Sequence, residues 1–251
     1  MRLSGETVGI AIFILCAAGG IGGCGPGQKT KSVQDYIAIL GGNDYLLRLD
    51  AVQKLGQLKE PVAVPFLIKS LADSDPAIRA GSALALGLIA DPLAVDSLLQ
   101  AVNDPNENVR RDAVGALGSF DQPRTRAAAL GALKDSGSYP RYAACRALGR
   151  LKAAEAVAPL LQAARDDTNS YVRTAAVMAL GEIGDPKSFP GLLQALRDVS
   201  SYVRSAAAAA LGKLGNRAAV PQLRRCLQDP NLWVRTDAAG ALYRLGSPEG
   251  L

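Results

Sequence analysis

Apolar and polar positions alternate in units of 31 or 32 residues from Asp44 onwards. Each unit contains two apolar runs, separated by short segments rich in Gly, Pro, Asp and Asn. Within a run the apolar residues lie three or four positions apart, as in Val172, Ala176, Ala179 and Ile183. That spacing is typical of an amphipathic α-helix, so each unit predicts two helices.

An arginine lies near the start of the first helix in every unit. These arginines are Arg48, Arg79, Arg110, Arg141, Arg173, Arg204 and Arg235, with separations of 31, 31, 31, 32, 31 and 31 residues. A leucine follows seven positions later, and glycine comes directly after that leucine in every unit but the last, where Tyr243 replaces it. A fixed period of roughly 20 to 50 residues predicts a solenoid, in which each unit packs only against its neighbours.

Residues that favour helix ends occupy matching positions in the units. Four residues before the arginine, the candidate N-caps are Asp44, Asp75, Asn106, Gly137, Asn169, Ser200 and Asn231. Gly184, Gly215 and Gly246 are expected to end first helices, and Pro61, Pro92, Pro123, Pro186 and Pro248 are expected to open second helices. We therefore predict an all-α fold over residues 32–251, with seven helices of each kind and a half-unit at each end.

Small side chains indicate how closely the helices approach. The chain is 49% hydrophobic but only 5% aromatic, and its first helices are rich in alanine around the Leu-Gly step. This composition predicts thin, closely packed helices instead of one thick core. The third unit departs from the pattern because Arg126 replaces an apolar residue, so its second helix is expected to pack loosely.

The repeated strings "VRRDAVGALGSF", "VRTAAVMALGEIGDP" and "VRSAAAAALGKLGN" resemble HEAT repeats, specifically the short HEAT-like units of phycobilin lyases. The resemblance covers residues 32–251 and implies a right-handed α-α superhelix of about seven two-helix units. The family includes lyases, hydroxylases and plain scaffolds, so the resemblance implies a fold and not one activity.

Residues 1–23 differ from the rest and predict an export signal. An apolar stretch from Val8 to Ala18 has the length of a signal-peptide core. Ile21-Gly22-Gly23-Cys24 resembles the lipobox of bacterial lipoproteins, which implies cleavage before Cys24, lipidation of Cys24 and anchoring to a bacterial membrane. By the family's rule, Gly25 after the cysteine favours the outer membrane, facing the periplasm. An uncleaved anchor or an ordinary signal peptide is the alternative, and residues 24–31 are expected to form a flexible tether.

The amino-acid composition excludes several kinds of functional site. The chain has no histidine, which excludes histidine-dependent catalysis and histidine-ligated metal sites. With 28 basic and 23 acidic residues the net charge is +5, too small an excess to predict nucleic-acid binding. Cys145 and Cys226 belong to non-adjacent units, so we expect no disulfide between them and no nucleophile. We expect no cofactor, metal or small-molecule substrate.

Two surface features are candidates for binding a partner protein. Two residues before the arginine, the last four units carry Tyr139, Tyr171, Tyr202 and Trp233. This aromatic row predicts either packing of each ring over its neighbour's loop or a partner-binding edge. The arginines themselves are expected to pair with loop aspartates in a structural ladder.

The exposed face of the second helices is the other candidate, and we expect it to line the concave side of the solenoid. Its polar residues are Lys69, Gln100, Gln162, Gln194 and Arg225, with Lys134, Arg165 and Arg197 three positions further on. Such a face is either simply solvated or able to hold an acidic segment. Together these features predict a membrane-tethered, non-catalytic interaction scaffold, with a phycobilin-lyase-like or other HEAT-like enzyme subunit as the alternative.

Overall fold

The computed structural model describes residues 31–247, which contain fourteen α-helices, five short 3-10 helices and no strand. The first helices of the units are α2 (Tyr45–Leu58), α4 (Pro76–Ile89), α6 (Glu107–Leu117), α8 (Ser138–Arg150), α10 (Ser170–Ile183), α12 (Ser201–Leu214) and α14 (Leu232–Arg244). The second helices are α1 (Val33–Leu40), α3 (Val64–Ser70), α5 (Val95–Ala101), α7 (Pro123–Ala132), α9 (Val157–Asp166), α11 (Phe189–Ala195) and α13 (Val220–Cys226). The prediction of seven helices of each kind is confirmed.

The helix ends follow the capping residues. All seven predicted N-cap residues occupy the N-cap position of a first helix. Gly184 and Gly215 terminate α10 and α12 in the left-handed conformation, with φ of 72° and 75°. Gly246 also has a positive φ, 70°, but α14 has already ended at Arg244.

The predicted start of the second helices is correct in position but not in helix type. Pro61, Pro92 and Pro186 open the 3-10 turns η1 (Pro61–Ala63), η2 (Pro92–Ala94) and η4 (Pro186–Ser188), each of which leads into an α-helix. The turns η3 (Ala154–Ala156) and η5 (Arg217–Ala219) do the same without proline. Only Pro123 opens an α-helix directly, and Pro248 lies outside the described residues.

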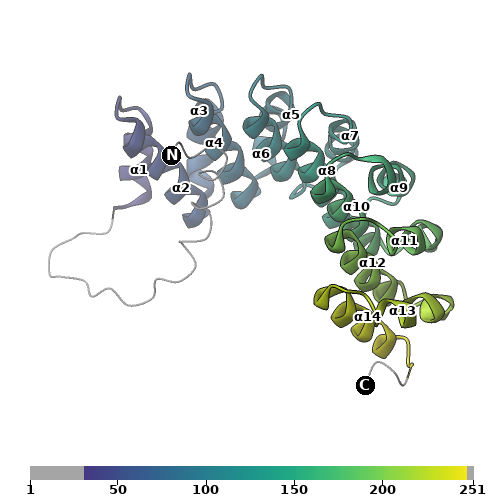
Figure 1. Cartoon of the computed structure of the whole chain (residues 1–251). Coiled ribbons are helices and arrows are strands. Elements are labelled where there is room, and N and C mark those ends of the chain that lie inside the picture. Colours follow the sequence, from purple (N-terminus) through teal and green to yellow (C-terminus); the bar gives the residue numbers. More distant parts are fainter. Residues whose placement is uncertain (1–30, 248–251) are drawn as a thin grey trace, which may run out of the picture. The chain divides into compact units, whose positions relative to one another are not determined.

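The helix pairs from α1 to α14 stack side by side in a curved row (Figure 1). The first helices line the inner, concave side of the curve, and the second helices line the outer, convex side. The expectation that the second helices form the concave side is therefore wrong. The physical reason lies in the Leu-Gly step, where neighbouring first helices approach so closely that this side of the stack is the shorter one.

Glycine makes this close approach possible. A Cβ added to Gly87 would lie 2.6 Å from the Cβ of Ala116, and one added to Gly181 would lie 2.7 Å from the Cβ of Ala210. Real side chains do not tolerate such separations, so each first helix contacts the next through a Gly–Ala pair. Tyr243, the residue at the glycine position of the last unit, is 62% exposed.

Alanine, valine and leucine fill the space between the two layers, and the core changes at the third unit. One group of buried apolar residues runs from Val52 to Phe120, and a larger one runs from Ala129 to Leu245. In α7 the fully buried Thr125 takes the place of an alanine and donates its hydroxyl to the carbonyl oxygen of Phe120. Arg126, at an apolar position of the other units, turns to Asp121 and Glu155 instead.

Candidate functional site

The arginine series is a structural ladder. The arginine of each of the first six units pairs with the aspartate of the following loop, as Arg48–Asp73, Arg79–Asp104, Arg110–Asp135, Arg141–Asp167, Arg173–Asp198 and Arg204–Asp229. These side chains are 8% to 18% exposed. Arg79 also donates to the carbonyl oxygen of Asp73 in its own loop at 2.8 Å. The predicted ladder is confirmed, and Nε of Arg48 is the one buried guanidinium nitrogen of the described residues without a hydrogen-bond partner.

Hydrogen bonding sets the charge state of the ladder. The guanidinium of Arg79 holds the pKa of Asp104 below its ordinary value, despite partial burial, and the backbone N–H of Asn106 adds to the effect. Asp135 and Asp229 have lowered pKa values for the same reason, from Arg110 and Arg204. Since these groups stabilise one another's charged forms, their shifts reflect architecture and not a catalytic site.

The aromatic row lies on the concave side, in the first turns of α8, α10, α12 and α14. Its members Tyr139, Tyr171, Tyr202 and Trp233 are 55%, 63%, 60% and 70% exposed. The rings of Tyr171 and Tyr202 stack with their centroids 6.1 Å apart and their planes 28° apart. Arg111 lies over the ring of Tyr139, 6.0 Å from its centroid. The three tyrosine rings therefore each contact a neighbouring side chain, yet all four residues of the row are more than half exposed.

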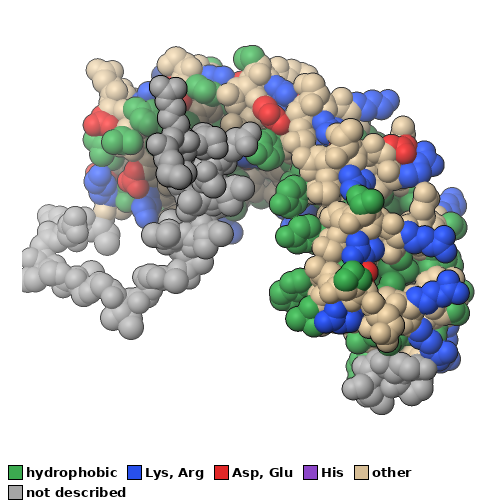
Figure 2. All heavy atoms as spheres, viewed as in Figure 1, with side chains coloured by type: hydrophobic (Ala, Val, Ile, Leu, Met, Phe, Trp, Pro, Cys, Tyr) green, Lys and Arg blue, Asp and Glu red, His purple; other side chains and the backbone are tan. Residues whose placement is uncertain are grey.

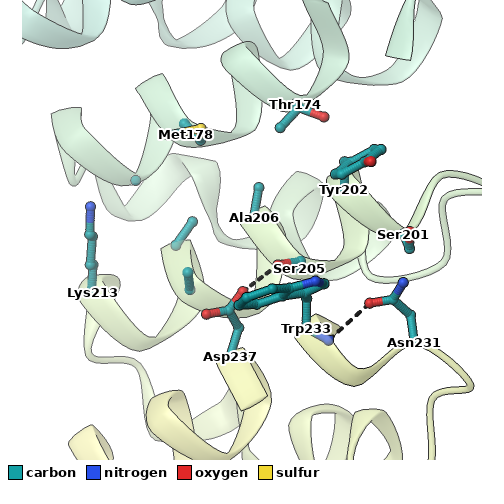
Figure 3. A pocket seen from close by; sticks show the side chains of 13 residues that line it. Thr174, Met178, Ser201, Tyr202, Ser205, Ala206, Lys213, Asn231, Trp233 and Asp237 are labelled. Carbon is teal, nitrogen blue, oxygen red and sulfur yellow. Dashed lines mark hydrogen bonds between the residues drawn. The ribbon is translucent and has the colours of Figure 1, made fainter. Parts of the chain in front are cut away.

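A recess opens beside this row, between α10, α12 and α14, with a volume of about 380 Å³ (Figure 3). Tyr202 and Trp233 stand at one end of the recess, and Lys213 stands at the other. Ala206 and Ala209 on α12 line it with side chains small enough to leave the space open. We call this site the concave recess.

Two hydrogen bonds engage polar groups of the concave recess. The hydroxyl of Ser205 on α12 donates to the carboxylate of Asp237 on α14. The side chain of Asn231 accepts from the backbone N–H of Trp233 at 2.9 Å, which caps α14. The site can therefore offer apolar contact, aromatic faces and the ammonium of Lys213. These are the means of a binding site, and they include no acid–base pair.

The two sides of the stack carry different kinds of side chain. Hydrophobic side chains gather along the inner edge of the C-terminal half, and Lys and Arg side chains gather along its outer edge (Figure 2). The eight polar residues predicted to line a concave groove are all exposed, but six belong to the second helices on the convex side, and Lys134 and Arg197 lie just after α7 and α11. The structure thus separates them from the aromatic row.

The two cysteines in the described part of the chain are free and buried, as expected. Burial raises the pKa of the Cys145 thiol to about 12, which keeps it protonated and unreactive. Across residues 31–247, no group of three or more Cys, Asp or Glu residues is placed to hold a metal ion. No helix in the same range has the length and apolar character needed to cross a membrane. Cys24 lies outside the described residues.

Comparison with known families decides the classification. The HEAT-repeat family model matches residues 33–118, 95–181, 130–198 and 189–251, which together cover nearly the whole solenoid. This chain is a HEAT-repeat protein. No curated protein matches the sequence.

Solved structures agree on the HEAT fold. The complex of CpcE and CpcF of phycocyanin lyase from Nostoc sp. PCC7120 matches with a TM-score of 0.60 and 24% identity, over 89% of this chain and 92% of that one. YibA from E. coli matches with a TM-score of 0.64 and 21% identity, over 85% of this chain and 81% of that one. Human deoxyhypusine hydroxylase matches with a TM-score of 0.44 and 24% identity, over 85% and 84% of the two chains. At these identities the first two matches establish the fold alone.

The concave recess was not predicted from the sequence, although its signal is present there. Ala206 and Ala209 are three residues apart, so they lie on one face of α12, where α10 carries Met178 at the second position. Sequence reasoning took the alanines only as packing residues. It also placed the concave side on the wrong helices, so the small residues were not read together with Tyr202 and Trp233.

Proposed function

We propose that this HEAT-repeat protein is a non-catalytic scaffold, anchored to a bacterial envelope membrane through a lipid on Cys24, which binds another protein along the concave face of α8 to α14. The observation that carries the proposal is the row of four aromatic rings, each more than half exposed, next to the concave recess. Tyr and Trp are enriched at binding hot spots because rigid amphipathic rings bury a large area at a small entropic cost.

The charged groups of the chain support a binding role over a chemical one. The chain has no histidine, and the lowered pKa values of Asp104, Asp135 and Asp229 arise from the arginines of the ladder. Similarity to the CpcE–CpcF complex favours a second candidate, a subunit of a lyase-like enzyme. That candidate requires a site for a chromophore and an intracellular location, and residues 1–24 favour export instead.

Loss of the aromatic row tests the binding surface. Crosslinking in membranes of the source cell, followed by isolation of the full-length protein, should capture a defined partner. The double variant Tyr171→Ala/Tyr202→Ala should lose this capture while its thermal unfolding stays near that of the wild type. Phe66→Ala on α3 is the matched control, because Phe66 is 43% exposed on the convex side. Lost stability with retained capture would refute the binding surface.

Lipidation is tested separately. Metabolic labelling with an acyl-chain analogue should mark the wild-type protein and leave Cys24→Ala unmarked. Two or more acyl chains hold a protein on a membrane durably, so the variant should also leave the membrane fraction. An intact chain that still carries residues 1–23 and is soluble in the cytoplasm would contradict the anchor and leave the concave surface unaffected.

A further inference from the structure

The two ends of the concave recess differ chemically. Tyr202 and Lys213 lie eleven positions apart on α12, so about 16 Å of helix separates the aromatic end from the cationic end. An extended peptide covers that distance in about five residues, at roughly 3.3 Å per residue. A volume of about 380 Å³ is within the range of ligand sites and leaves room for one large apolar side chain.

The end of the concave recess opposite Tyr202 and Trp233 is positively charged. Lys213 lines this end, and a Cβ built on Gly212, the residue before it on α12, would lie 3.3 Å from Nη1 of Arg244 on α14. Glu182, at the matching position of α10, reaches the other way: its Oε2 lies 2.6 Å from where a Cβ on Gly149 of α8 would be. The carboxylate is thus directed toward α8, and Lys213 is the cation that lines this end of the recess.

The recess also holds one negative charge, the carboxylate of Asp237. Asp237 accepts a hydrogen bond from Ser205 and lies beside the indole of Trp233, on the side that faces Lys213 (Figure 3). A ligand carboxylate is therefore disfavoured near Trp233 and favoured near Lys213. This asymmetry gives a bound segment one preferred orientation.

We propose that the concave recess binds a short acidic segment of the partner protein, which inserts a large apolar side chain between Tyr202 and Trp233 and places a carboxylate about four residues away, beside Lys213. The proposal rests on the scaffold function above and specifies the chemistry that its concave face recognises. The apolar anchor provides most of the affinity, because it removes aromatic and alanine surface from water. The carboxylate fixes the orientation.

Trp233 is the sole tryptophan of the chain and lines the recess, so its fluorescence reports occupancy directly. The full-length protein is titrated with acetyl-Phe-Ala-Ala-Ala-Asp-amide, which contains no tryptophan. We expect a saturable change of the emission. A peptide with Asn in place of Asp should bind about 2- to 5-fold more weakly at low ionic strength, which is the effect of one exposed ion pair, and added salt should remove the difference.

A variant with a larger side chain in the recess tests the proposed binding most directly. Ala209→Leu should abolish the titration without harming the fold, because Leu84 and Met178 occupy the same helix position in α4 and α10 at 43% and 39% exposure. Gln53→Leu, at this position in α2, is the matched control and should bind like the wild type. In Lys213→Ala the ratio of the affinities for the Asp and Asn peptides should fall to near 1.

Several results would contradict the proposal. An unchanged titration in Ala209→Leu, equal affinity for the Asp and Asn peptides in low salt, or no saturable response overturns the proposal. An emission change that follows the concentration of the protein and not that of the peptide would also overturn the proposal, since a second copy of the chain would then occupy the recess. If Ala209→Leu still captures the partner in crosslinking while Tyr171→Ala/Tyr202→Ala does not, the scaffold function stands and the acidic segment fails.

Discussion

Arg141 in the first turn of α8 forms a two-point ion pair with Asp167 of the following unit, with Nε 2.7 Å from Oδ2 and Nη2 3.0 Å from Oδ1. Its third nitrogen, Nη1, donates to the carbonyl oxygen of Asp135 in its own loop at 2.9 Å. One guanidinium therefore ties two successive loops together. The same arrangement recurs at Arg79, Arg110 and Arg204, so the ladder holds the register of the stack.

Removing one rung should destabilise the solenoid. Arg141→Ala leaves Asp167, whose side chain is only 8% exposed, without its partner, and we expect a loss of about 1.5–3 kcal/mol in the free energy of unfolding. Urea denaturation followed by circular dichroism measures this loss. Arg165→Ala is the control, because Arg165 and Asp166 are 60% and 50% exposed and their pair should matter little. Equal effects of the two variants would show that the ladder does not contribute to stability.

The ladder also predicts acid sensitivity. Hydrogen bonds from Arg79, Arg110 and Arg204 lower the pKa values of Asp104, Asp135 and Asp229 below the ordinary 3.8. The unfolded chain therefore binds more protons than the folded chain at acidic pH. The stabilisation is fully present above the ordinary pKa and is lost as pH falls through the lowered values of the folded state.

Urea midpoints recorded from neutral pH down to about pH 2 should stay level at first and then fall below about pH 4. In Asp104→Asn the fall should be shallower, because one of the shifted carboxyl groups is missing, while stability at neutral pH is lower. A wild-type midpoint that stays level throughout the acid range would contradict this role of the aspartates.

The sequence was sufficient to predict the helices, the N-caps of the first helices and the arginine ladder, because each depends on residues that recur at fixed spacing. It was not sufficient to predict the direction of curvature. Both helices of a unit have one apolar and one polar face, and periodicity distinguishes the two faces without saying which row of helices is shorter. The deciding quantity is the distance across pairs such as Gly87 and Ala116, which depends on packing in three dimensions.

The aromatic row illustrates the same limit at the candidate site. Its four members could be named from the repeat, because they share one position. The concave recess beside Trp233 arises from side chains of three helices, α10, α12 and α14, and its volume depends on the small side chain of Ala209, where α10 carries Met178 at the matching position. The difference between Ala209 and Met178 at one matched position indicates a recess only once it is known that this position lies on the concave side.

Close helix approach predicts opposite effects for two glycine substitutions. In Gly181→Ala the new Cβ would lie 2.7 Å from the Cβ of Ala210, so α10 and α12 must separate, and we expect a loss of about 1–3 kcal/mol. In Gly115→Ala the new Cβ meets no described atom within 4 Å, and the better helix propensity of alanine should add about 0.5–1 kcal/mol. Urea denaturation of both variants tests the pair, and a stabilising Gly181→Ala would contradict the Gly–Ala contact.

Burial predicts that Cys145 is inert in the folded protein. Its side chain is fully buried, and its pKa is raised to about 12 chiefly by burial, so the reactive thiolate is scarce near neutral pH. Iodoacetamide treatment of the native full-length chain, read out residue by residue by mass spectrometry, should leave Cys145 unmodified. Cys226, which is 9% exposed, should react somewhat faster, and the two rates should become equal in urea. Rapid alkylation of Cys145 without denaturant would show that α8 opens readily, because the thiol becomes accessible only when the contacts of α8 with its neighbours are broken.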